Sequence, residues 1–327
     1  MRERARRTWA ILLLLAPFGC ALLRSAPRPP EEWTLISFPG EPLPSPSRDS
    51  LWNSWPALAI GCAGPDTITF ALELRCDAGN RYFDRHALIV SNWTPSGYRP
   101  DVLRAIMSQA DGRKRFASQA AALASDGGYE GMLLDLRLLG PRDVDPFVRL
   151  VTAIADSARS SGISPVGIVV PIADTAAYPG RHLGAVTDFL AASLELDPAT
   201  AGPLTPRDRM SGLVGARAAE IGAHRVMLLL PADGYLWAAG AARRRISFEE
   251  AVATARDWGV ELTRDETSAT LRARAPGRGE IWVNDATLIS GIVRDARRLG
   301  IRKFALYGLG GEDPGIWSAI ASRAITR

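Results

Sequence analysis

The chain has 327 residues, of which 47% are hydrophobic and 23% charged, and its formal net charge is +4. This composition is ordinary for a globular protein with a full core, and the length allows two ordinary domains or one large barrel. Most of the basic excess lies in the first 20 residues, and the chain contains no basic-aromatic module. We therefore expect no nucleic-acid partner.

The N-terminus predicts an export signal. A basic start precedes an apolar stretch, Trp9 to Phe18, and the small residues Gly19 and Ala21 flank Cys20. Cys20 suggests a lipoprotein signal over residues 1–20, with lipidation at that cysteine. Cleavage after Ala21 by an ordinary signal peptidase is the alternative. An uncleaved anchor is a third, although the apolar run is shorter than the roughly 20 residues that span a bilayer.

The protein is therefore expected to be exported, as a periplasmic or outer-membrane lipoprotein or in secreted form. It would touch a membrane only through its N-terminal signal or lipid anchor. Residues 21–32 are rich in proline and predict a tether, which leaves residues 33–327 for the folded domain. Cys62 and Cys76 could close a loop of about 15 residues worth roughly 3 kcal/mol in an oxidising compartment. Two unpaired buried thiols are the alternative.

Apolar and amphipathic stretches then alternate along the chain. Strands are predicted at 33–38, 57–61, 87–91, 165–172, 188–196 and 225–230, and helices at 111–125, 141–160 and 205–221. This rhythm favours parallel βα units. Since (β/α)₈ barrels take about 250 residues, we predict the α/β class and a single (β/α)₈ TIM barrel.

An insertion is predicted at about residues 246–280, between the last two barrel strands. Ser247 and Glu250 have the spacing of a capping box at the start of a helix. Alternating residues between 260 and 274 predict a small sheet after that helix. The final long helix is expected to begin near Asn284. The barrel would thus carry a small α+β insertion.

The segment from Tyr129 to Arg137 is the most informative part of the chain. Side chains alternate between the two faces of a strand, so Leu133, Asp135 and Arg137 are expected to point into the barrel and its mouth. The apolar residues between them would lie under the helices. One interpretation is that Asp135 and Arg137 are simply an ion pair on one face at a strand end.

This segment resembles the Asp-Gly-x-Asp-x-Asp-x-Glu motif of glycoside hydrolase family 18, the chitinase-like barrels. In that family the last Glu protonates the glycosidic oxygen, and the preceding Asp orients the substrate's N-acetyl group, which acts as the nucleophile. Here Asp135 is retained, but Arg137 stands at the acid position, Leu133 replaces the first inner Asp and Glu130 replaces the opening Asp. A guanidinium stays charged and cannot serve as a general acid. The resemblance therefore implies a barrel without glycosidase activity.

Three further segments resemble the same family and occur in the expected order. They are His86 to Thr94, Leu228 to Trp237, and Ser247 to Trp317. The last is similar to the domains that bacteria fuse to polysaccharide deacetylases and glycosyltransferases. The family comparison implies ligand-binding residues at Asn92, Trp93, Asp135, Glu195, Tyr235, Trp237, Trp282 and Tyr307.

Tyr307 stands where the family has its barrel-floor Trp, so an aromatic floor for a sugar would remain. We expect no cofactor, and the three histidines, His86, His182 and His224, are too scattered to predict a metal site. Aromatic residues near strand ends are more often part of a core than a ligand platform. Each of these aromatic assignments therefore has a structural alternative.

Glu195 aligns with a strand end that carries a Met-x-Tyr-Asp motif in the family. We expect it to pair with Arg137 across the barrel, because a buried charge without a partner is costly. The functional hypothesis is an exported barrel that binds or scaffolds N-acetylglucosamine-type envelope polysaccharide, or works with the machinery that handles it. Two alternatives stay open: an active hydrolase that uses Asp135 with Glu130 or Glu195, and a protein-interaction barrel without sugar binding.

Overall fold

The computed structural model describes residues 32–41, 58–75, 86–195, 200–205 and 207–324. The signal segment with Cys20, nearly all of the proposed tether, and Cys76 lie outside these residues, as does the side chain of Cys62. Lipidation and the disulfide therefore stay predictions. Within the described ranges, no helix has both the length and the apolar character needed to cross a membrane.

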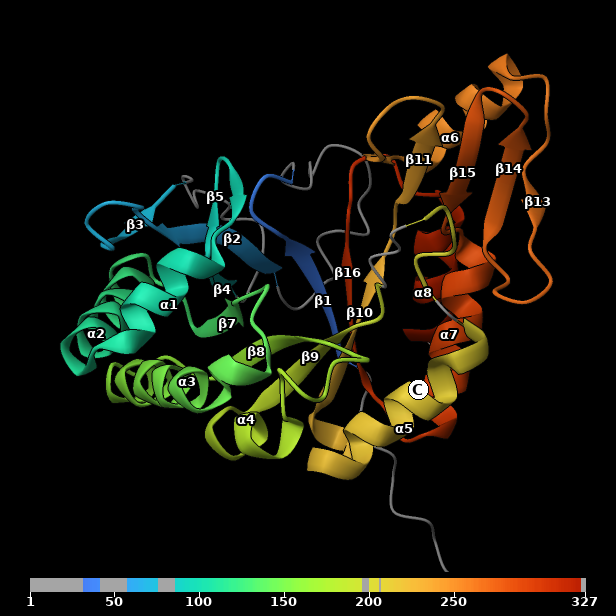
Figure 1. The fold of residues 1–327 in the computed structure, drawn as a ribbon. Helices are drawn as coiled ribbons and strands as arrows, with labels where there is room; N and C mark the ends of the chain where they lie inside the picture. The colour runs from blue at the N-terminus through green and yellow to red at the C-terminus, as the bar shows by residue number, and fades with distance from the viewer. Residues whose placement is uncertain (1–31, 42–57, 76–85, 196–199, 206, 325–327) are drawn as a thin grey trace, which may run out of the picture. The chain divides into compact units, whose positions relative to one another are not determined.

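Parallel strands form the closed ring of a barrel (Figure 1). In order around the ring they are β1 (Glu32–Ser37), β2 (Leu58–Pro65), β4 (His86–Ser91), β7 (Gly131–Asp135), β8 (Val166–Pro171), β9 (Phe189–Ser193), β10 (Val226–Pro231) and β16 (Lys303–Tyr307). The ring closes because β1 pairs in parallel with both β16 and β2. A short antiparallel strand, β3 (Leu72–Leu74), pairs with β2. The predicted TIM-barrel fold is confirmed.

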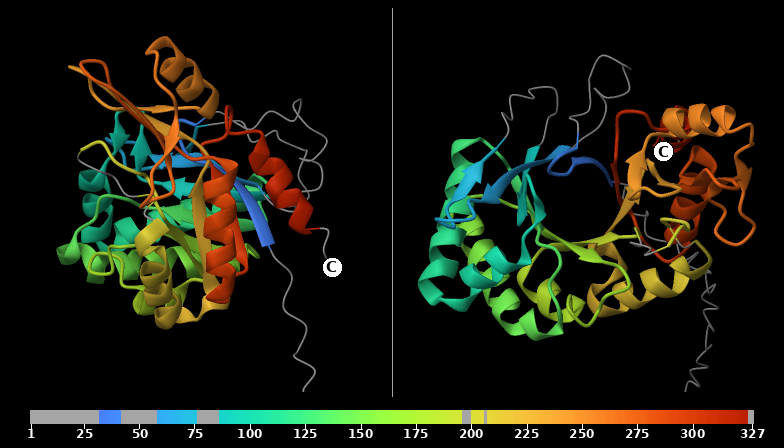
Figure 2. Two further views of the ribbon diagram at one scale, coloured as in Figure 1. Left: turned by 90° about the vertical axis from the view of Figure 1, so that its right-hand side faces the viewer. Right: turned by 45° about the horizontal axis from the view of Figure 1, so that its top comes forward.

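Helices cover the outside of the ring (Figure 2). They are α1 (Pro100–Ser108), α2 (Ala110–Asp126), α3 (Val144–Ser160), α4 (Gly180–Val186), α5 (Arg207–Ile221), α7 (Ala286–Arg298) and α8 (Gly315–Ala324), with 3₁₀ turns at Pro141–Asp143 and Ala223–Arg225. The described parts of the first two connections, from β1 to β2 and from β2 to β4, contain no helix. The predicted helices match α2, α3 and α5 to within a few residues. Helices α1, α4 and α8 were not predicted.

Two apolar layers follow from the alternation of side chains along the strands. Leu133 packs inside the ring with residues such as Ile89, Val169 and Leu229, contributed by four different strands. The residues Met132, Leu134 and Leu136 belong instead to the larger core between the strands and the helices. This is the division that the pattern of residues 132–136 predicts.

The insertion between β10 and β16 is a five-stranded antiparallel sheet with one helix. Its strands are β11 (Gly234–Ala238), β12 (Arg244–Ile246), β13 (Thr263–Arg264), β14 (Leu271–Ala275) and β15 (Gly279–Val283), in the order β12-β11-β15-β14-β13. Helix α6 (Phe248–Asp257) packs on β11 and β15. The sheet begins before residue 246 and ends after residue 280, so it is larger than predicted. It extends beyond the carboxyl end of β10 (Figure 1).

Both predicted starts of the late helices are present. The Ser247 hydroxyl accepts a hydrogen bond from the Glu250 backbone N–H at 3.0 Å, which caps α6. The side chain of Glu250 does not complete a capping box; it pairs with Arg244 at 2.5 Å. The Asp285 carboxylate accepts from the Leu288 N–H at 3.0 Å and caps α7.

Candidate functional site

A cleft of about 710 Å³ opens at the carboxyl ends of the barrel strands. Its walls come from the segments after β1, β4, β7, β8 and β9, from the end of β16 and from the insertion. Aromatic residues that line it are Phe38, Trp93, Tyr98, Tyr178, Tyr235 and Tyr307, and charged residues that line it are Glu41, Arg137, Asp174, Glu195, Arg243 and Arg245. A cleft with both aromatic and charged walls is suited to a polar ligand that has apolar faces.

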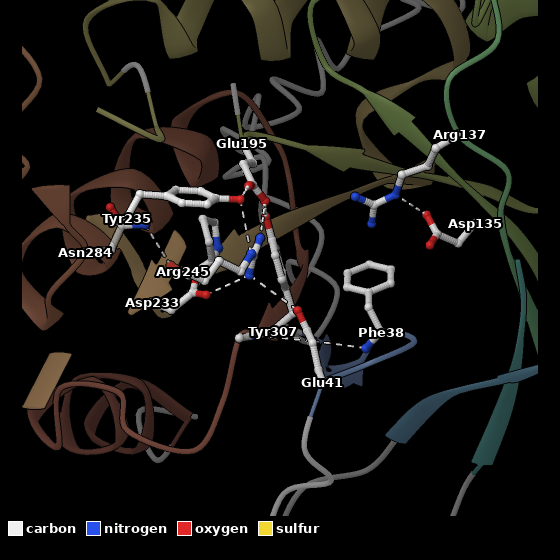
Figure 3. Close-up of polar contacts among 12 residues, drawn as sticks. Phe38, Glu41, Asp135, Arg137, Glu195, Asp233, Tyr235, Arg245, Asn284 and Tyr307 are labelled. Atoms are coloured by element: carbon white, nitrogen blue, oxygen red, sulfur yellow. Dashed lines mark hydrogen bonds and ion pairs between the residues drawn. The ribbon is translucent and has the colours of Figure 1, made fainter. Parts of the chain in front are cut away.

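Arg137 lies on one side of this cleft and is held by a buried acid (Figure 3). Its Nε donates to Asp135 Oδ1 at 2.6 Å, and the Asp135 side chain is fully buried. The Tyr98 hydroxyl donates to the other oxygen of Asp135 at 2.7 Å. The guanidinium carbon also lies 4.8 Å from the ring centres of both Phe38 and Tyr98. The side chain is therefore oriented by an ion pair and two cation–π contacts.

The backbone of Arg137 is fixed as well. The Asn92 amide accepts from the Arg137 N–H at 2.8 Å and donates to the Arg137 carbonyl at 3.0 Å. The next residue, Leu138, has a φ of 63° and is 60% exposed at the rim of the cleft. A leucine in the left-handed region is strained. The backbone strain therefore lies directly beside Arg137.

A second arginine, Arg245 on β12, is surrounded by acids on the other side of the cleft (Figure 3). It forms ion pairs with Glu195 at 2.6 Å, Asp233 at 2.7 Å and Glu41 at 3.4 Å. Two tyrosine hydroxyls complete the group by donating to Glu195, at 2.9 Å from Tyr235 and at 2.7 Å from Tyr307. We call these six residues the Arg245 cluster.

The acids of the Arg245 cluster differ in their titration. Burial alone would raise the pKa of Glu195, but Arg245 and the two tyrosine hydroxyls outweigh it and hold the pKa below its ordinary value. Burial raises the pKa of Asp233 to about 7, with Arg245 opposing and Glu195 and Glu41 adding to the shift. Burial also raises the pKa of Glu41. At neutral pH, Glu195 is thus the ionised partner of Arg245.

Buried polar groups under the cleft hold its loops in place. The Tyr178 hydroxyl donates to the Leu136 carbonyl at 3.1 Å and accepts from the Leu139 N–H at 3.3 Å, which ties the β8 loop to the β7 loop. Arg217 on α5 is fully buried and donates to four carbonyl oxygens, those of Pro171, Ile172, Asp174 and Tyr178. These contacts set the positions of Tyr178 and Asp174 on the cleft wall.

Trp93 reaches the cleft because a glycine lies beneath it. A Cβ at Gly40 would come within 3.0 Å of the Trp93 ring, and Gly40 also has a φ of 83°. Both observations require glycine at this position. The indole is therefore positioned on the cleft wall by the loop that follows β1.

Four of the predicted ligand-binding residues line the cleft: Trp93, Glu195, Tyr235 and Tyr307. Asp135 and Asn92 are buried behind Arg137 and support it. Trp237 and Trp282 lie on the insertion sheet, outside the cleft lining, and Trp282 is 5% exposed. The structure therefore does not bring these two predicted ligand-binding residues to the cleft.

Two expectations about charges need correction. The ion pair expected between Arg137 and Glu195 is not among the contacts of these described side chains, because each has a nearer partner in Asp135 and Arg245, respectively. The simple pairing of Asp135 with Arg137 on one face is what the structure contains. Glu130 is exposed and precedes β7, so it lies at the opposite end of that strand from the cleft.

Sequence reasoning missed Glu41, Tyr98, Asp233 as a buried acid, and Arg245. Arg245 is the last of three consecutive arginines, a pattern that usually indicates a solvated face. Tyr98 was detectable in part, since Pro95, Ser96 and Gly97 are typical of a tight turn. The structure has a hairpin there, between β5 (Trp93–Thr94) and β6 (Gly97–Tyr98). The described residues contain no group of three or more side chains arranged to hold a metal ion.

The fold is that of the GH18 chitinases. A chitinase from Chromobacterium violaceum has a TM-score of 0.76 and 18% identity, over 91% of this chain and 100% of that one. The spore cortex-lytic enzyme SleL of Bacillus megaterium has a TM-score of 0.78 and 14% identity, over 91% and 75%. A mutant GH18 chitinase from Cycas revoluta, in complex with (GlcNAc)4, has a TM-score of 0.70 and 18% identity, over 90% and 99%.

The sequence matches no protein-family model and no curated protein. At such low identities the structural neighbours establish a chitinase-like GH18 barrel and no activity. Function has to be argued from the side chains of the cleft.

Proposed function

We propose that this chain binds N-acetylglucosamine-type polysaccharide in the barrel cleft and does not hydrolyse it. The observation that carries the proposal is the side chain of Arg137, which fills the position of the family's general acid and is paired with Asp135 at 2.6 Å. Asp135 is still present, but it is buried behind that guanidinium. A guanidinium cannot donate a proton to a leaving group at any workable pH.

The three carboxyl groups of the Arg245 cluster do not take over the acid role. Glu195 has a pKa below its ordinary value and accepts hydrogen bonds from Arg245 and two tyrosines. Glu41 has a raised pKa, but its oxygens face the Phe38 N–H at 3.0 Å and Arg245 at 3.4 Å. Asp233 titrates near pH 7 but is not part of the cleft lining. Acid catalysis needs a proton within hydrogen-bond reach of the leaving oxygen.

Sugar binding is supported by the aromatic residues that remain. Trp93, Tyr235 and Tyr307 line the cleft, and their ring faces suit the apolar faces of pyranose rings. The Cycas revoluta neighbour is in complex with (GlcNAc)4, and the Bacillus megaterium neighbour is a spore cortex-lytic enzyme. Together with the expected export signal, these observations favour a polysaccharide of the cell envelope. The protein would be a periplasmic, lipid-anchored or secreted partner of that polymer or of its machinery.

The test is a glycan array probed with the exported protein, run beside a hydrolysis assay on chito-oligosaccharides. We expect binding to N-acetylglucosamine oligomers, no release of reducing ends, and no activity in Arg137→Glu. Turnover by the wild type that disappears in Asp135→Ala would instead establish a hydrolase. Absence of binding to every glycan would favour a protein-interaction barrel.

Trp93→Ala gives the binding test a residue-level readout. Loss of the indole is expected to weaken binding about tenfold, or about 1.4 kcal/mol. Phe70→Ala is a suitable control, because Phe70 is a 39% exposed aromatic residue outside the cleft lining. Equal affinities of both variants and the wild type would contradict binding in the cleft.

A further inference from the structure

Arg137 presents free hydrogen-bond donors to the cleft. Its Nε is occupied by Asp135, but among the described residues neither of its two terminal nitrogens has a hydrogen-bond partner. The side chain is 31% exposed and lines the cleft. In Figure 3 these terminal nitrogens point away from Asp135, towards the side of the cleft that holds Glu195 and Tyr307.

The guanidinium is already fixed in this orientation. Asp135 holds Nε, the rings of Phe38 and Tyr98 lie 4.8 Å from the guanidinium carbon, and Asn92 holds the backbone. A ligand that bonds to the terminal nitrogens would thus lose little side-chain entropy. Burial disfavours the charged form, but Asp135 outweighs it and raises the pKa of Arg137, so the group is cationic at every physiological pH.

The neighbouring acids of the protein do not use these donors. Glu195 accepts from Arg245, Tyr235 and Tyr307, and Glu41 accepts from Phe38 and pairs with Arg245. Each of these two acids thus has hydrogen-bond or ion-pair partners other than Arg137. The terminal nitrogens of Arg137 are left for a group that enters from the cleft.

We infer that Arg137 binds a carboxylate carried by the polysaccharide, so that the ligand is an acidic N-acetylhexosamine polymer and not a neutral one. This inference rests on the proposed function, since it identifies the class of sugar in the same cleft. A guanidinium matches the two oxygens of a carboxylate through two parallel hydrogen bonds. The carboxylate can belong to a hexuronic acid in the chain or to a lactyl ether on the hexosamine; both present the same two oxygens.

Four oligosaccharides of equal length distinguish these sources. One is the neutral N-acetylglucosamine tetramer, one alternates N-acetylglucosamine with glucuronic acid, and one alternates it with its lactyl ether, N-acetylmuramic acid. The fourth is the methyl ester of whichever acidic ligand binds more tightly. We expect calorimetry on the wild type to give at least about tenfold tighter binding for one acidic oligosaccharide than for the neutral one. The methyl ester should lose that advantage, because it has no charge and only one good acceptor.

Variants of Arg137 test whether the preference for a carboxylate depends on the paired donors of the guanidinium. Arg137→Met is expected to bind the acidic and neutral oligosaccharides equally, and Arg137→Lys to recover only part of the preference, because an ammonium cannot form the paired hydrogen bonds. Arg104→Met is the matched control: Arg104 also pairs with an aspartate, Asp143, but on the outer helices, and this variant should keep the full preference.

Equal affinity of the wild type for acidic and neutral oligosaccharides would overturn the carboxylate site while leaving polysaccharide binding intact. Absence of binding to all of them would instead overturn the proposed function itself. The comparison of acid with methyl ester needs only the wild type, so it decides the question even if Arg137→Met does not fold.

Discussion

Two of the three arginines that line the cleft, Arg137 and Arg245, differ in how many of their hydrogen-bond donors the protein occupies. Arg245 donates to three carboxylates and to the Tyr235 hydroxyl, while Arg137 pairs with one carboxylate and leaves two nitrogens without a described partner. Both are partly buried, with side chains 33% and 31% exposed. Burial therefore does not distinguish them; the number of occupied donors does.

This difference separates a structural role from a binding role. The Arg245 cluster contains residues that follow or end β1, β9, β10 and β16, together with two residues of the insertion. Its ion pairs and hydrogen bonds therefore connect the barrel to the insertion. Arg137 is fixed at Nε by the buried Asp135, and its terminal nitrogens face the cleft. This arrangement is expected of a ligand-binding group. The same residue type thus has two functions within one cleft.

The largest effect is expected from Arg245→Met. The change leaves Glu41, Glu195 and Asp233 without their shared cation, and breaking a buried ion pair in this way costs about 3 kcal/mol or more. Urea unfolding should show a loss of that size. The control is Arg244→Met on the same strand, whose surface pair with Glu250 is worth about 1 kcal/mol at most. Similar losses in both variants would contradict the structural role of the Arg245 cluster.

A double-mutant cycle should show which acid is the partner of Arg137. Arg137→Met leaves Asp135 buried without its cation, so combining it with Asp135→Asn should recover about 2 kcal/mol of unfolding free energy. Combining Arg137→Met with Glu195→Gln should give nearly additive losses, since Glu195 pairs with Arg245. Strong coupling in the second cycle and none in the first would restore the pairing expected from the sequence.

A smaller effect concerns pH and Asp233. Its folded-state pKa of about 7 lies above the usual value for an aspartate, so the folded state binds a proton that the unfolded state has released. Stability from this group is present at low pH and falls as pH rises towards and through 7. From pH 6 to pH 7.5 the loss is about 1 kcal/mol.

Asp233→Asn removes this titration. Its unfolding free energy should therefore fall less than that of the wild type over the same pH interval, by about 1 kcal/mol. Glu195 adds no slope in this range, because its lowered pKa keeps it ionised in both states. Identical pH profiles of the variant and the wild type would show that Asp233 does not carry this proton.

The sequence by itself determined the barrel and the inner face of β7. Alternation placed Leu133 inside the ring and Met132, Leu134 and Leu136 against the helices, because a strand that is buried on both faces still has only two directions for its side chains. Asp135 and Arg137 were recognised as neighbours on one face for the same reason. The cap at Ser247 and the start of the last long helix near Asn284 were predictable because helix starts are marked by residues close together in the sequence.

Only the tertiary structure decided the partners of these charges. Arg245 meets Glu41, which lies about two hundred positions earlier in the chain, and Glu195, which lies fifty positions earlier. Charge pairing depends on distance in space, and a run of three arginines gives no sign of which one turns inward. Because the sequence does not show where the insertion lies, Arg137 was the only cationic partner that it suggested for Glu195. Because the insertion sheet places Arg245 beside Glu195, Asp135 is the carboxylate that pairs with Arg137 among the described residues, and the terminal nitrogens of Arg137 point into the cleft.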